Sequence, residues 1–179
     1  MLYRMFLVCV CLSVYTSASS LSCRWVHHKF SHLSRRSMDL LDTMAHNSTN
    51  TTEDAEINFP NDLYNQASKA SAEDKLRFSV QILEEMLALF DEDHSNASWE
   101  VQTVEHFLMV VTQQADGLHS CIKRHGHKKK NKKLQMYFGR LSRRVLEHMG
   151  HSAESWELIR KEMKVHLMKT DQLVLSLTN

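Results

Sequence analysis

The sequence of 179 residues has few of the glycine, proline and aromatic residues that β-structure and phosphate-binding loops require. It contains only four glycines and one proline, and aromatic residues make up 8% of the chain. No segment alternates apolar and polar residues between Gly- or Asn-rich turns, so strands and hairpins are not predicted. The scarcity of glycine also excludes loops of the kind that cradle phosphates. An all-α fold is therefore expected.

The sequence also lacks the patterns that mark common catalytic and metal sites. It has no HExxH, GxSxG, P-loop or GxGxxG motif. Glu105 and His106 do not form an acid–base pair, because neighbours on a helix point about 100° apart. A structural zinc ion needs four ligands, and His28 and His32 supply only two on one helix face. We expect neither an enzyme nor a cofactor or metal site.

One long apolar run is present, and it lies at the N-terminus. Arg4 supplies a positive charge, residues 5–14 form an apolar run that only Ser13 interrupts, and small residues follow. The run is too short to span a bilayer. This pattern predicts a signal peptide at 1–22, with cleavage after Ser20 or Ser22. Since no later segment has the length of a membrane span, we expect a secreted, extracellular protein without membrane insertion.

The segment 23–179 has the length of one domain. Nothing in its composition suggests assembly, so a monomer is expected. Removal of the signal peptide leaves two cysteines, Cys23 and Cys121. In an oxidising compartment this pair predicts one disulfide, the alternatives being two free thiols or bridges between molecules. Closing a loop of this length is expected to stabilise the fold by about 4–5 kcal/mol.

Three Asn-x-Ser/Thr sequons agree with secretion. They begin at Asn47, Asn50 and Asn96, each in a polar stretch between apolar periods. A glycan on such a connection can remain in solvent, so all three are predicted glycosylation sites.

Apolar residues recur at spacings of three and four along most of the mature chain, which predicts helices. Five are expected, at about 24–45, 72–91, 98–119, 129–149 and 152–177. Ser71 with Asp74 resembles a capping box, and Ser152 can cap the last helix. Gly150 is suited to the position that follows a helix C-terminus.

The connections predict how these helices are arranged. The three later connections are short, which makes their helices antiparallel neighbours. The helix at 98–119 is roughly 30 Å long, whereas a disulfide needs Cα atoms within about 7 Å. Cys121 can therefore reach Cys23 only if the first two helices run parallel, joined by a crossover at 46–71. This is the up-up-down-down arrangement of helical cytokine bundles, here with five helices.

Four stretches of the sequence carry a resemblance to a known family. They are CRW (23–25), NFPNDLY (58–64), WEVQTVEHFLMVVTQQADGLHSC (99–121) and SWELIRKEMKVHL (155–167). Together they resemble a type I interferon, most closely the two-cysteine group of bony fish. The pattern Trp156-Glu157-x-x-Arg160 and the Cys23–Cys121 pair are the most specific parts of the resemblance.

The resemblance implies an antiviral cytokine that binds a two-chain class II cytokine receptor. Such proteins trigger tyrosine-kinase signalling and interferon-stimulated gene expression. The tighter receptor chain is usually engaged by the first helix, the loop after it and the exposed face of the last helix. On that last helix, Arg160, Lys161 and Lys164 are the expected contacts. The alternatives are a solvated charged face, or a helical cytokine of another family.

Charge is distributed unevenly along the chain. Residues 23–120 contain 7 Lys and Arg against 16 Asp and Glu, whereas 121–179 contain 14 against 5. The most basic stretch, HGHKKKNKKL at 125–134, holds the lysines Lys128, Lys129, Lys130, Lys132 and Lys133. It predicts either a solvated run or a site for heparan sulfate or another polyanion. Nucleic acid is not an expected partner, because base-reading side chains do not accompany the lysines.

Overall fold

The structure, a computed structural model, describes residues 28–45, 57–122 and 129–177. An N-terminal helix covers 28–44, and no strand occurs in these three ranges. The helices that follow are α2 (Asn61–Ser68), α3 (Ala72–Phe90), α4 (Val101–Ser120), α5 (Lys132–Leu141), the π-helix η2 (Ser142–Glu147) and α6 (Ala153–Leu175). The predicted all-α class is confirmed.

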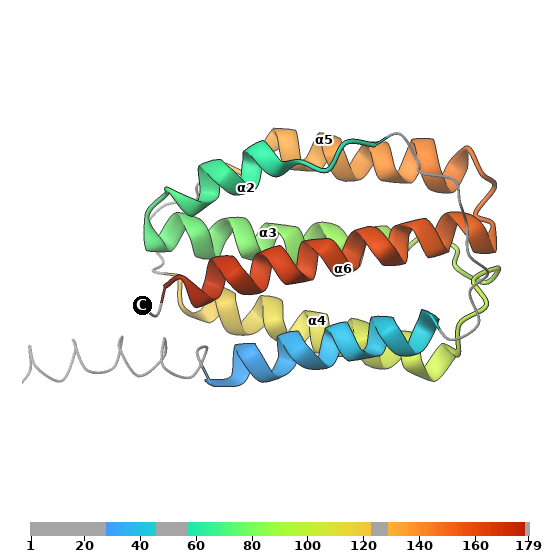
Figure 1. Cartoon of the computed structure of the whole chain (residues 1–179), viewed down its shortest axis with the longest axis horizontal. Coiled ribbons are helices and arrows are strands. Elements are labelled where there is room, and N and C mark those ends of the chain that lie inside the picture. The colour runs from blue at the N-terminus through green and yellow to red at the C-terminus, as the bar shows by residue number, and fades with distance from the viewer. Residues whose placement is uncertain (1–27, 46–56, 123–128, 178–179) are drawn as a thin grey trace, which may run out of the picture.

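The helices form a bundle in which α3 is central, since it contacts α4, α5 and α6. The N-terminal helix and α3 run in the same direction, whereas α4 and α6 run in the opposite direction (Figure 1). The additional helix α5 runs parallel to α3 and leads through η2 into α6. The up-up-down-down arrangement predicted from the cysteines is therefore present.

The long connection before α3 contains a helix that the sequence does not predict. Pro60 occupies the position before α2, whose first turn carries Asp62. The helix buries Leu63, Tyr64 and Ala67, and it contacts α3 and α6. Eight residues give too short an apolar period to be distinguished from a loop, so tertiary packing is what holds this segment helical.

Local capping signals, in contrast, predict the helix ends well. The Ser71 hydroxyl accepts from the Asp74 N–H at 3.2 Å at the start of α3. At the start of α6 the Ser152 hydroxyl accepts from the Ser155 N–H at 3.2 Å. Gly150 has a φ of +62° after η2, as expected for the residue that ends a helix.

The predicted helix at 129–149 differs from expectation at both its start and its end. Asn131 caps it by accepting from two backbone N–H groups, so α5 begins only at Lys132. After Leu141 the chain continues as a π-helix, whose wider turn accommodates an extra residue. As a result, Val145 and Leu146 are both fully buried.

One histidine lies inside an aromatic cluster of the core. His166 on α6 packs against Phe59, Tyr64, Tyr137 and Phe138. The Tyr64 hydroxyl oxygen and His166 Nδ1 are 2.6 Å apart. Burial disfavours the imidazolium and lowers the pKa of His166 to about 3. The ring is therefore neutral in the folded protein at physiological pH.

This burial predicts an acid-sensitive stability. In the unfolded chain the imidazole has a pKa of about 6.5. Below that pH the unfolded state binds a proton that the folded state does not bind, and this favours unfolding. Between pH 8 and pH 5 the histidine alone is expected to remove about 2 kcal/mol of stability. Urea unfolding at the two pH values should show that His166→Gln loses correspondingly less over the interval. Equal losses in the variant and the wild type would contradict the burial of this ring.

Candidate functional site

The outward side of α6 carries an exposed stripe. Its members are Lys161, Val165, Met168 and Leu175, which are spaced by four, three and seven residues and so lie on one helix face. Val165 is 38% exposed, Met168 47% and Leu175 39%. Large apolar side chains are thus presented to solvent in a row along one helix, beside a lysine.

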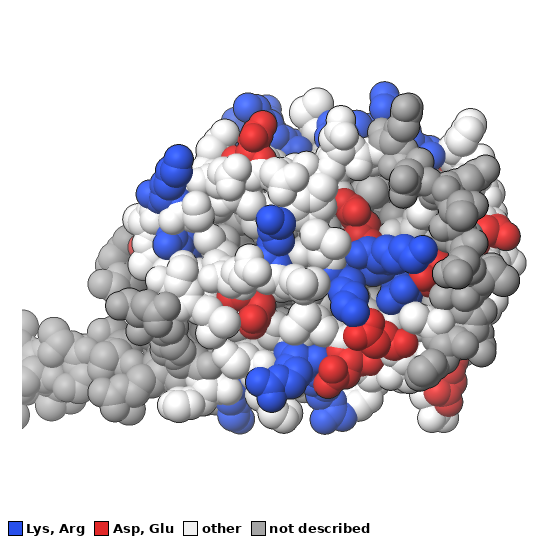
Figure 2. All heavy atoms as spheres, viewed as in Figure 1, with Lys and Arg blue, Asp and Glu red and all other residues white. Residues whose placement is uncertain are grey.

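The stripe lies between two other parts of the molecule. Along one edge, Lys164 Nζ is 2.5 Å from Asp42 Oδ1 on the N-terminal helix. At the other edge, Lys169 Nζ is 5.9 Å from the centre of the Phe59 ring, just before α2. Figure 2 shows Lys and Arg side chains gathered over α6, with Asp and Glu beside them over the N-terminal helix. Three elements therefore contribute to one face.

Arg160 does not belong to this face, contrary to the expectation from the sequence. The side chain lies inside the bundle, and the residue is only 6% exposed. Its guanidinium donates to both carboxylate oxygens of Glu157, at 2.6 and 2.8 Å, and to the Leu41 carbonyl at 3.0 Å. Glu157 is itself 4% exposed. With its donors used inside the protein, Arg160 is removed from the candidate contacts.

The Glu157–Arg160 pair joins α6 to the end of the N-terminal helix. Leu41 lies in the last turn of that helix, at the negative end of the helix dipole. The Arg160 guanidinium donates to the Leu41 carbonyl, and its positive charge complements that negative end. The pair therefore fixes the position of one helix against another.

Trp156 in the same motif has a similar structural task. The side chain is fully buried, and its indole N–H donates to the Asp93 carbonyl at 3.1 Å in the α3–α4 connection. Its ring packs against Phe90 and Trp99. The most specific part of the family resemblance is thus a set of buried contacts that hold three segments together, while the exposed residues of α6 lie elsewhere.

The two predicted lysines of α6 lie at the surface. Lys161 is exposed, with its Nζ 4.0 Å from Glu157 Oε1, and Lys164 pairs with Asp42. Val165 and Met168 were not predicted. They could have been found as apolar residues four and seven positions after Lys161, off the core stripe of Trp156, Ile159, Met163 and Leu167.

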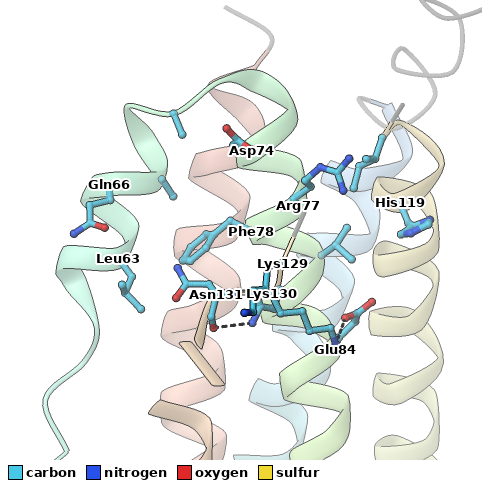
Figure 3. A pocket seen from close by; sticks show the side chains of 15 residues that line it. Leu63, Gln66, Asp74, Arg77, Phe78, Glu84, His119, Lys129, Lys130 and Asn131 are labelled. Carbon is cyan, nitrogen blue, oxygen red and sulfur yellow. Dashed lines mark hydrogen bonds and ion pairs between the residues drawn. The ribbon is translucent and has the colours of Figure 1, made fainter. Parts of the chain in front are cut away.

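The structure divides the predicted lysine run. Lys128 lies outside the described residues, and Lys129 and Lys130 precede α5. Lys130 pairs with Glu84 at 2.9 Å across a groove of about 420 Å³ that α3 and α2 also line (Figure 3). The hydrogen bond that the Lys130 ammonium donates to the Glu84 carboxylate raises the pKa of Lys130. The exposed Lys132 and Lys133 belong instead to the first turn of α5, so the described lysines of the run lie on two different elements.

The predicted disulfide and glycans are only partly within the described residues. Cys121 is half-buried directly after α4, and Cys23 lies outside the described residues. His28 and Ser120 line one pocket, so the N-terminal helix begins beside the end of α4. Asn96 is exposed in the α3–α4 connection, whereas Asn47 and Asn50 fall outside the described residues. The bridge and the three glycans stay predictions.

The described ranges contain neither a membrane-spanning helix nor a cluster of metal-binding side chains. None of their helices is long and apolar enough to cross a bilayer. Nor do these ranges contain a group of three or more His, Cys, Asp or Glu side chains placed to hold a metal ion.

Comparisons with known proteins agree with one another. Residues 26–177 match the family described as the interferon alpha/beta domain. The chain is 35% identical over 151 residues to interferon a3 of Oncorhynchus mykiss, covering 84% of each protein. Zebrafish interferon 1 is a similar solved structure, with a TM-score of 0.71 and 28% identity over 85% of this chain and 97% of that one. The chain therefore belongs to the interferon alpha/beta family, as a type I interferon of the kind found in fish.

Proposed function

We propose that this interferon is a secreted, monomeric antiviral cytokine that binds a two-chain class II cytokine receptor and triggers tyrosine-kinase signalling. Interferon-stimulated gene expression follows from that signalling. Membership of the family makes the chain a cytokine and not an enzyme. The observation that supports receptor binding most is the exposed stripe of α6, flanked by the N-terminal helix and the residues before α2.

The composition of this stripe suits a protein partner. Single exposed apolar residues are common on any surface, but a row of them on one helix face is a feature of interaction sites. Val165 and Met168 would form the apolar centre of the contact, and Lys161 and Lys164 its charged rim. Apolar centres contribute most of the affinity, whereas rim cations mainly steer an acidic partner into place.

Truncation of the apolar centre should weaken receptor binding without loss of fold. Met168→Ala is expected to reduce affinity for the tighter receptor chain by about 10- to 30-fold, the effect of losing a residue at the centre of an interface. The matched control is Met109→Ala on α4, which removes an equally large side chain that is 50% exposed. Surface plasmon resonance with the receptor ectodomain measures both. An equal effect of the two substitutions would contradict a site on α6.

The function itself is tested with purified residues 23–179 on cells of a bony fish. Receptor-kinase phosphorylation and protection from viral killing are expected at nanomolar dose, and an antibody to one receptor chain should abolish both. No response to correctly folded, disulfide-bonded protein would contradict the proposal.

A further inference from the structure

A second charged surface lies on α5 and η2, and the proposed receptor stripe does not use it. Between residues 129 and 146 the sequence has seven Lys and Arg and no Asp or Glu. Five of these cations stand on the two helices, namely Lys132, Lys133, Arg140, Arg143 and Arg144. Four are exposed and Arg140 is half-buried. Lys and Arg side chains stand along the upper edge of the molecule in Figure 2, where Figure 1 shows α5.

Helix geometry places these cations on one side. Lys132, Met136, Arg140 and Arg144 follow at intervals of four, and Arg143 lies three positions after Arg140. Residues three or four apart are neighbours on a helix surface. The opposite side is buried, through Leu134, Tyr137, Phe138 and Leu141. The π turn then buries Val145 and Leu146 together and leaves Arg143 and Arg144 outward. From position 132 to 144 the basic face extends for roughly 18 Å.

The fold does not neutralise this face. Within the described ranges, no ion pair joins any of its five cations to a carboxylate, whereas Lys130 pairs with Glu84 and Lys164 with Asp42. The Arg140 guanidinium instead lies 5.8 Å from the centre of the Tyr137 ring. The Arg143 guanidinium lies over Gly139, 3.7 Å from the position that a Cβ atom would occupy on this glycine. Both guanidinium groups thus pack against the surface of their own helix and form no ion pair with a carboxylate in the described ranges.

The placement of the cations favours an anion from outside. Lys132 and Lys133 stand in the first turn of α5, at the positive end of its dipole, where lysines are disfavoured. Arg140 and Arg144 are one turn apart and repel each other. A bound oxyanion would relieve both unfavourable interactions, and the arginine forks can each donate two hydrogen bonds to it.

We propose that the face formed by Lys132, Lys133, Arg140, Arg143 and Arg144 binds linear sulfated polysaccharides of the heparan-sulfate class. Such chains repeat their oxyanions along their length, which matches cations distributed over one long face. Nucleic acid fits less well, because Tyr137 and Phe138 are buried and leave no ring for base stacking. A membrane surface also fits less well, since Met136 is the one large apolar side chain exposed along α5 and η2.

Heparin binding by the full mature chain tests this proposal independently of any receptor. The test variant is Arg140→Gln/Arg143→Gln/Arg144→Gln, and the control is Arg35→Gln/Arg36→Gln/Lys69→Gln, which removes three exposed cations elsewhere. The test variant is expected to elute from heparin at lower salt and to lose affinity by about tenfold or more, the control by less than about twofold. Circular dichroism melting establishes that both variants are folded.

Several results would overturn the proposal. Equal losses of heparin affinity in the two triple variants would mean that binding depends only on the net charge of the protein. A loss confined to Lys129→Gln/Lys130→Gln would place the site in the segment before α5. Undiminished binding to desulfated heparin would remove the role of sulfate, and stronger binding to duplex DNA of matched charge would assign the face to nucleic acid. Receptor signalling is measured separately, so failure here leaves the proposed cytokine function untouched.

Discussion

Replacing Arg160 by alanine is expected to lower the free energy of unfolding by about 3–5 kcal/mol, because a buried carboxylate is left without its partner. Both oxygens of Glu157 accept from this guanidinium, at 2.6 and 2.8 Å, and both residues are nearly inaccessible to water. The substitution also removes the donor to the Leu41 carbonyl. Urea unfolding at neutral pH measures the loss.

Two controls distinguish the cost of leaving a buried charge unpaired from the cost of breaking an exposed ion pair. Lys164→Ala breaks a more exposed pair with Asp42 and should cost less than about 1 kcal/mol. The double variant Glu157→Leu/Arg160→Leu removes both charges and should recover a large part of the stability lost in Arg160→Ala. If Arg160→Ala costs no more than Lys164→Ala, the pair is not buried as described.

The same substitution distinguishes a structural residue from a receptor contact. Arg160→Ala should reduce signalling only in proportion to the unfolded fraction, so activity per folded molecule stays at the wild-type value. Met168→Ala should do the opposite, with unchanged melting and weaker signalling. The two residues are eight positions apart on α6 but differ in exposure, 6% against 47%.

Breaking the predicted disulfide should have an effect of similar size. Cys121→Ser is expected to destabilise the protein by about 4–5 kcal/mol, because the unfolded chain regains the freedom of a long loop. For a domain of this size, that corresponds to a fall in melting temperature on the order of 10 °C. Secretion should fall as well. Calorimetry under non-reducing conditions measures the change in melting temperature.

The two cysteines provide their own control. Cys23→Ser, Cys121→Ser and the double variant all remove the same bond, so their melting temperatures should coincide. Unchanged melting in Cys121→Ser, or a clear difference between the single variants, would show that the two sulfurs are not joined. The start of the N-terminal helix beside the end of α4, where His28 and Ser120 line one pocket, is the arrangement that the bond requires.

Features determined by neighbouring residues could be predicted from the sequence. The helix predicted at 72–91 is Ala72–Phe90, and that predicted at 152–177 is Ala153–Leu175. In both, a serine hydroxyl marks the start, and caps act over only a few residues. The bundle topology followed from helix length and the cysteine pair, which are also properties of the sequence.

Features determined by distant packing could not be predicted in the same way. A basic residue beside other basic residues is normally exposed, and Arg160 is buried only because Glu157 and Leu41 receive its hydrogen bonds. The one signal in the sequence that Arg160 could be buried was Glu157, three residues earlier. The π turn likewise depends on Leu146 finding room in the core. On the exposed side of α6, Lys161 and Lys164 were singled out from the sequence, whereas the exposed apolar residues Val165 and Met168 were missed.

The most direct test of the receptor assignment is photo-crosslinking from α6. A photoreactive phenylalanine analogue at position 168 is expected to form a covalent adduct with the tighter receptor chain on responsive cells. The same analogue at position 109 of α4, where Met109 is also half exposed, should form none with that chain. An adduct from position 109 but not from position 168, with both proteins folded and active, would contradict the site on α6.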